Sequence, residues 1–182
     1  TKITDVDFKY ADKMGTSVKL FGSSRMGEEK IHAWVAPVMI GPEHPLYSVT
    51  DVFNGILVKG NMLGTTMYYG SGAGKLPTAS AVVADIIEAV QNADRHVEMG
   101  WDDERLEIAD MSTSAHRYFV RVEGKAADKA EDMKAVFGEA EFIELENMDE
   151  FAVLTPVLTE TALQEKIAGV SGIRQLIRAE LA

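Results

Sequence analysis

The feature that most limits the fold of this chain is a segment near its middle, residues 78–93, that is apolar on nearly every side of a helix. Asp85 and Glu88 are the exceptions to that apolar surface. A helix with so little polar surface must bury most of its circumference, as helices enclosed within a protein do. The segment therefore predicts a helix that lies between two layers of the fold.

The part of the chain before this segment predicts one short helix and two hairpins. Thr4, followed three positions later by Asp7, is a capping signature for a helix that ends at Met14 and closes at Gly15. Residues 17–26 and 30–40 predict the first hairpin, because apolar residues alternate along its second arm. Residues 52–58 and 62–69, joined by a turn at 59–61, predict a second hairpin rich in strand-forming residues.

An acidic stretch follows the apolar helix. Residues 94–110 contain seven acidic residues and two arginines, a composition typical of a solvated connection between domains. We therefore place the domain boundary here. The expected division is a first domain at residues 1–93, an acidic linker at 94–114 and a second domain at 115–182.

The second domain shows a different pattern. Its expected strands are residues 118–122, 142–145, 151–155 and 173–177, and its expected helices are residues 126–137 and a segment capped by Thr159. The resulting order, β-α-β-β-α-β, is that of the ferredoxin-like fold. The predicted class is therefore α+β: an antiparallel or mixed sheet with covering helices, followed by a ferredoxin-like domain.

Charge and composition exclude several classes of function. The net charge of −11 repels polyanions, so we expect neither nucleic acid nor a membrane as a partner. The chain has no cysteine, which excludes disulfides, thiolate nucleophiles and cysteine-bound metals and fits a cytoplasmic location. It also has no apolar run of about 18 residues, the length that a membrane-spanning helix needs.

A glycine-rich loop at residues 70–77 is the sharpest local signal of function. Gly70, Gly72 and Gly74 alternate along the chain just before the apolar helix. Their exposed N–H groups and the helix dipole would suit an anion or a carbonyl oxygen. The spacing G-x-G-x-G matches neither the dinucleotide fingerprint G-x-G-x-x-G nor a P-loop. A flexible joint between strand and helix is the alternative interpretation, and spacing alone leaves both open.

The other candidate groups give weaker evidence for a functional site. The four histidines have no metal-ligand spacing, and we expect no metal site. Asp85 on the apolar helix needs a hydrogen-bond partner or a shifted pKa, and a bond to nearby backbone is the preferred expectation. The histidines are His32, His44, His96 and His116, of which His44, in a turn between prolines, is the one weighed for ligand contact.

Read as a string, the region from Pro37 to Asp85 resembles the C-terminal part of homoserine dehydrogenase. The glycine-alanine-glycine loop leading into P-T-A-S-A-V-V-A-D is the most specific part of this resemblance, which covers roughly residues 1–92. Ser71 stands where the family usually has proline, and Gly55 where it usually has alanine. The segments that carry the resemblance are His44-Pro45-Leu46, Val52-Phe53-Asn54-Gly55, residues 69–74 and residues 77–85.

The resemblance implies an oxidoreductase of threonine and methionine biosynthesis that interconverts L-homoserine and L-aspartate 4-semialdehyde with NAD or NADP. It implies that Gly72, Ala73 and Gly74 approach the nicotinamide end of the cofactor. By the same resemblance, the Rossmann domain and the family's catalytic lysine lie outside these residues. We therefore expect no catalytic residue here, no tight cofactor binding, and no activity of the 182-residue chain alone.

The tail is similar to an ACT domain, although it lacks the D-x-P-G-like turn with which such domains bind amino acids. Residues 122–128 occupy that position, so a structural or assembly role is the better expectation. A non-catalytic regulatory or binding protein with an ACT-like domain is the alternative function. We also expect a homodimer, because the hairpins have more apolar residues than one helix covers, and a higher oligomer through the ACT-like domain is left open. Candidates for its buried sheet faces are Val35, Phe53, Ile56, Leu57 and Met67.

Overall fold

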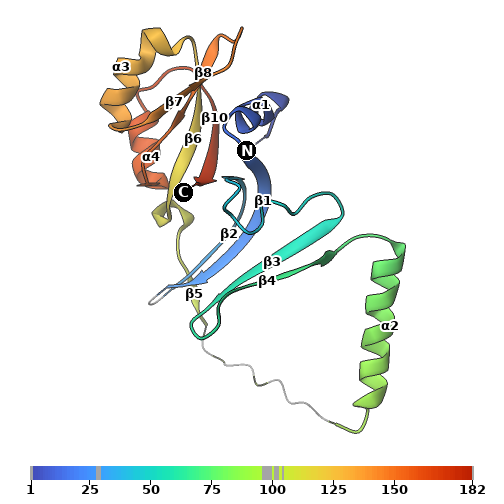
Figure 1. Cartoon of the computed structure of the whole chain (residues 1–182). Helices are drawn as coiled ribbons and strands as arrows, with labels where there is room; N and C mark the ends of the chain where they lie inside the picture. Colours follow the sequence, from blue (N-terminus) through green and yellow to red (C-terminus); the bar gives the residue numbers. More distant parts are fainter. Residues whose placement is uncertain (1, 28–29, 96–99, 101–102, 104, 182) are drawn as a thin grey trace. The chain divides into compact units, whose positions relative to one another are not determined.

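The computed structural model describes residues 2–27, 30–95, 100, 103 and 105–181 (Figure 1). Contacts divide the chain into two compact units. Unit 1 consists of Thr1–His44 and Leu106–Ala182, and unit 2 is Pro45–Arg105.

Unit 1 is built on one mixed sheet. Along its main path the strands lie in the order β1-β2-β10-β6-β8-β7, and the β2–β10 pair is parallel while the other neighbours are antiparallel. The short strands β5 and β9 pair with β2 and β6. The bounds are β1 Ser17–Met26, β2 Lys30–Ile40, β5 Glu107–Ile108, β6 Ala115–Glu123, β7 Glu141–Glu144, β8 Glu150–Leu154, β9 Leu158–Thr159 and β10 Ile173–Glu180.

Helices cover both faces of this sheet because its central strands together carry buried apolar residues on both sides. Tyr118, Val120 and Val122 pack with α3 (Ala126–Phe137) and α4 (Glu160–Ile167). Phe119 points the other way and packs with Tyr10 of α1 (Asp5–Lys13). The expected α+β class with a mixed sheet is therefore observed, with a core on each side of the sheet.

Local signals place the helices of unit 1 as expected. The backbone N–H of Thr4 donates to the Asp7 carboxylate at 2.7 Å, and Gly15 follows α1 with φ +64°. The Thr159 hydroxyl accepts a hydrogen bond from the N–H of Ala162 at the start of α4. These caps depend on residues a few positions apart, so the sequence alone could predict them.

The contacts divide the chain elsewhere than at residues 93 and 115. Strand β10 pairs in parallel with β2, from Arg178 opposite Val38 to Glu180 opposite Ile40, and so joins the two expected domains in one sheet. The stretch expected as a linker also contains β5, which pairs with β2 while Lys30 forms an ion pair with Glu107. Residues 1–93 and 115–182 as separate domains remain a prediction.

Unit 2 contains the hairpin of β3 (Phe53–Gly60) and β4 (Gly64–Ser71) and the helix α2 (Lys75–Gln91). The expected turn at 59–61 is wrong by about two residues, because Gly60 pairs with Gly64, whose φ of +72° suits the end of the turn. The helix also starts at Lys75 rather than at Thr78, since Pro77 is accommodated within its first turn.

The expectation that α2 is enclosed between layers is not met within this chain. None of its residues is buried, and Ile86 and Val90 are 57% and 71% exposed. The described residues of unit 2 therefore leave its apolar sides uncovered. Among the described helices, none has the length and apolarity needed to cross a membrane.

Candidate functional site

The glycine loop connects β4 to α2 and lies entirely on the surface. Gly72, Ala73 and Gly74 are all exposed, so the structure presents the three predicted cofactor-facing residues to solvent. The N–H of Gly72 donates to the carbonyl of Val52 at 3.1 Å, which extends the hairpin pairing by one bond into the loop. The loop therefore begins with a bond to the residue just before β3.

Gly74 precedes α2 in a backbone conformation that only glycine adopts readily. Its φ is +120°, and a Cβ there would lie 3.4 Å from Cδ of Pro77. No side chain caps the helix at this residue. The first N–H groups of a helix have no intrahelical acceptor, so those of Lys75 and Leu76 are available to a ligand. The loop thus offers backbone donors, a positive helix end and no obstructing side chain.

The other candidate residues lie on other elements of the chain. His44 lies in unit 1, with Nε2 3.6 Å from Oε2 of Glu180. His116 shares a hydrogen bond of 2.8 Å with the Ser114 hydroxyl, and burial, with Arg178 nearby, lowers its pKa. Asp85 is exposed on α2. His32 lies on β2, and His96 falls outside the described residues.

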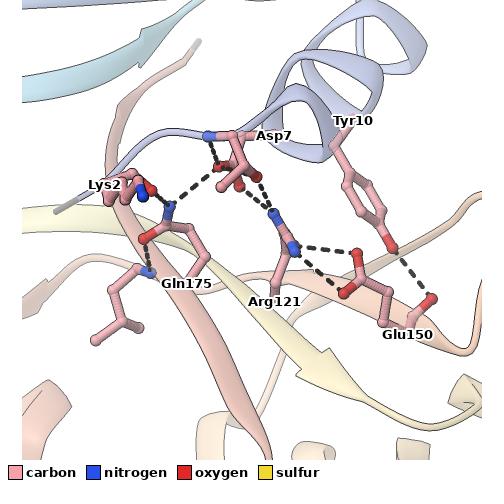
Figure 2. A network of polar contacts seen from close by, with 8 residues as sticks. Lys2, Asp7, Tyr10, Arg121, Glu150 and Gln175 are labelled. Atoms are coloured by element: carbon pink, nitrogen blue, oxygen red, sulfur yellow. Dashed lines mark hydrogen bonds and ion pairs between the residues drawn. The ribbon is translucent and has the colours of Figure 1, made fainter.

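Sequence reasoning missed a buried network of charges in unit 1 (Figure 2). Arg121 on β6 donates to Oδ1 of Asp7 at 2.6 Å, and its Nη2 donates to Oε2 of Glu150 at 3.1 Å. Gln175 on β10 donates to Oδ2 of Asp7 at 3.0 Å and to the carbonyl of Lys2 at 2.8 Å. One guanidinium and one amide therefore tie the N-terminal helix α1 to three strands of the sheet.

This network is shielded from water. The Asp7 side chain is 0% exposed, and that of Arg121 is 9% exposed. The hydroxyl of Tyr10 donates to the carbonyl of Glu150 at 3.1 Å, and burial, together with the charge of Glu150, raises the pKa of Tyr10 to about 12. Asp7 and Arg121 are 114 positions apart, so only the cap on α1 was visible in the sequence.

Acid should weaken this network. Burial favours the neutral form of Asp7, but hydrogen bonds from Gln175, the Thr4 backbone and Arg121 outweigh it and hold the pKa below the usual 3.8. A lowered folded-state pKa stabilises the fold above the unfolded-state value, and that stabilisation is lost as the pH falls through the folded-state value.

We therefore expect the urea midpoint of the chain to fall more steeply below about pH 4 than that of an Asp7→Asn variant, which has no carboxylate to protonate. Urea titrations at a series of pH values on both proteins measure this difference. Parallel pH profiles would contradict the assignment of this acid sensitivity to Asp7.

Comparison with known proteins gives one family. Residues 1–87 match the model of the homoserine dehydrogenase family. The homoserine dehydrogenase of Synechocystis sp. is 46% identical over 92 residues, which cover 48% of this chain and 21% of that protein. The homoserine dehydrogenase of Mycobacterium tuberculosis is 30% identical over 213 aligned positions, which cover 99% of this chain and 47% of that protein.

Solved structures show the same relation. A homoserine dehydrogenase from Thiobacillus denitrificans matches with a TM-score of 0.80 and 28% identity, over 98% of this chain and 46% of that one. A homoserine dehydrogenase of S. aureus at pH 7.0 matches with a TM-score of 0.69 and 28% identity, over 96% and 44%. The chain thus spans less than half the length of each of these relatives, but the structural matches include nearly all of it.

Proposed function

We propose that this chain, which belongs to the homoserine dehydrogenase family, supplies the C-terminal part of an enzyme that interconverts L-homoserine and L-aspartate 4-semialdehyde. The observation that carries the proposal is the family match over residues 1–87, which includes the glycine loop and most of α2. The enzyme serves threonine and methionine biosynthesis in the cytoplasm. It uses NAD or NADP, which accepts or donates the hydride.

Within this enzyme, Gly72, Ala73 and Gly74 face the nicotinamide end of the dinucleotide. Three features of the loop fit this role: its exposure, the absence of side chains at Gly72 and Gly74, and the uncapped start of α2. A close approach of backbone to a flat ring needs such small residues. The loop binds and orients, while proton transfer belongs to residues outside this chain.

The C-terminal region forms an ACT-like module with a role in assembly. Its strand order β10-β6-β8-β7 and the connecting helices α3 and α4 fit the ferredoxin-like arrangement. The side chain of Lys129 occupies the turn after β6. Its Nζ donates to the carbonyl of Glu123 at 2.8 Å and would lie 3.7 Å from a Cβ at Gly124. An amino acid effector would have to displace that lysine.

The enzyme forms a homodimer through the apolar faces of its hairpins. Val35 on β2 is 72% exposed and Ile56 on β3 is 63% exposed, although strands normally bury such side chains. Phe53, Leu57 and Met67 are also partly or largely open. Closed two-fold pairing is the commonest way to cover faces of this kind.

We expect sedimentation equilibrium of the chain at about 10–50 μM to give a dimer, a range in which obligate dimers remain associated. Val35→Lys should shift the chain toward monomer, because it places a charge on the proposed contact surface. The matched change Val157→Lys, at an exposed position of unit 1 outside the hairpins, should not. A wild-type monomer over the whole range would refute the dimer.

The activity itself is tested on two proteins. The product of the full reading frame that contains this chain should oxidise L-homoserine with NAD or NADP, whereas the 182-residue chain should show no turnover. Dinucleotide reduction at 340 nm measures both. An inactive full-length protein would favour the alternative, a non-catalytic regulatory or binding protein with an ACT-like module. Turnover by the repurified 182-residue chain would contradict the placement of the catalytic groups elsewhere.

A further inference from the structure

The space beside Gly72 is filled by a side chain from the neighbouring strand. A Cβ built on Gly72 would lie 1.3 Å from Nδ2 of Asn54 and 2.5 Å from its Cγ. Asn54 is on β3, opposite Gly70 of β4, and Gly72 is two residues further along the chain. The carboxamide of Asn54 therefore takes the place that a side chain at position 72 would need.

The backbone of Gly72 does not itself require glycine. Its φ lies outside the positive range that disfavours L residues, in contrast to Gly74 at +120°. The three atoms nearest to a Cβ at this position all belong to Asn54. Gly70, one residue before the end of β4, has no atom within 4 Å of a built Cβ. The close contact is thus specific to one glycine of the loop and to one partner.

We infer that Asn54 is a positioning residue of the cofactor-facing loop, an inference that rests on the proposed function of residues 72–74. Two contacts then hold Gly72: the N–H bond to the carbonyl of Val52, just before β3, and the side chain of Asn54 on β3, which fills its Cβ position. These contacts fix where the loop leaves the hairpin and in which direction, although the loop residues are exposed. Asn54 acts through Gly72, and the shape of its side chain is what matters.

The test is a double-mutant cycle in the full-length enzyme. Asn54→Ala empties the space beside Gly72, and Gly72→Ala displaces the Asn54 carboxamide from it. Each variant should raise the KM for the dinucleotide about 10-fold, which is less than the roughly 100-fold effect that a displacement of about 1 Å can cause. The KM for homoserine should change less than about 2-fold. The double variant should be no worse than either single one, because the new methyl group occupies the emptied space.

Two further variants separate shape from polarity and from general loop effects. Asn54→Leu keeps the branched shape without hydrogen-bonding atoms and should retain a dinucleotide KM within about 3-fold of wild type, by the same displacement argument. Gly60→Ala adds the same methyl group at the far end of the hairpin, where a Cβ would lie 3.8 Å from the carbonyl oxygen of Gly64, and it should change little. Additive effects of Asn54→Ala and Gly72→Ala, or a Leu variant as poor as the Ala variant, would overturn the inference.

A measurement without turnover keeps this inference distinct from the proposed function. In NMR spectra of the 182-residue chain, Asn54→Ala should shift the backbone amide signals of residues 72–75, and Gly60→Ala, at the far end of the hairpin, should shift them much less. If the full-length protein lacks dehydrogenase activity but these shifts occur, the proposed function fails and the positioning contact stands. If Asn54→Ala leaves the loop signals unchanged while the enzyme is active, the positioning role is wrong.

Discussion

Replacing Arg121 by alanine is expected to lower the free energy of unfolding of unit 1 by about 3–5 kcal/mol, the usual effect of removing one partner from a buried ion pair. The Asp7 side chain is 0% exposed and would lose its cationic partner, and Glu150, whose side chain is 12% exposed, would lose the same one. Both carboxylates would then be largely buried without a counter-charge. Urea unfolding of the 182-residue chain, followed by circular dichroism, measures the loss.

A surface arginine provides the matched control. Arg174 lies 2.7 Å from Oε2 of Glu123, but the two side chains are 53% and 51% exposed. Arg174→Ala should cost no more than about 1 kcal/mol, because water replaces an exposed ion pair with little loss. Arg121→Lys retains the charge but not the forked geometry and should fall between the two. If Arg121→Ala is no worse than Arg174→Ala, the network does not anchor α1.

Replacing Gly74 by valine in the full-length enzyme is expected to reduce kcat/KM for the dinucleotide by about 100-fold, the size of effect that a displacement of about 1 Å can cause. At φ +120° a branched residue is strained, and its Cβ would lie 3.4 Å from Pro77. The loop and the start of α2 must move to relieve that strain. Steady-state kinetics with both dinucleotides measure the effect.

Thermal unfolding of the same preparation tests whether the glycine loop binds the dinucleotide or is only a joint between β4 and α2. Gly138 also has a positive φ, +75°, and lies in unit 1 at the end of α3. Gly138→Val should therefore lower the melting temperature and leave the kinetics of the folded enzyme near normal. Gly74→Val should instead lower kcat/KM and leave the melting temperature near the wild-type value. Normal kinetics with a clearly lowered melting temperature for Gly74→Val would show that the loop is only a joint.

The candidate site shows which contacts a local sequence pattern can predict and which it cannot. The alternating glycines and the helix that follows them were visible in the sequence because they are adjacent. The structure places Gly70 in β4 and Gly72 and Gly74 in the exposed loop before α2. The contact between Asn54 and Gly72 was not visible, since it depends on the register of two strands. A shift of that register by one residue would turn Asn54 to the other face of the hairpin.

The apolar character of α2 shows that a sequence pattern does not identify what covers a helix. Its composition predicts burial, and yet Val90 is 71% exposed within this chain. Hydrophobic pattern reports that a surface needs a partner, but it carries no information about which chain or segment supplies it. The same holds for Val35 and Ile56, whose exposure supports the proposed dimer.

The sequence by itself determined the α+β class, the helices α1, α3 and α4, the caps of α1 and α4, and the family whose model residues 1–87 match. Capping, strand alternation and motif identity depend on residues close together in the chain. Only the tertiary structure decided that β10 pairs with β2 and that Arg121 joins Asp7 to Glu150. The β2–β10 pair and the bond from Arg121 to Asp7 join residues more than a hundred positions apart, and their stability comes from burial and charge pairing that exist only once the whole sheet is formed.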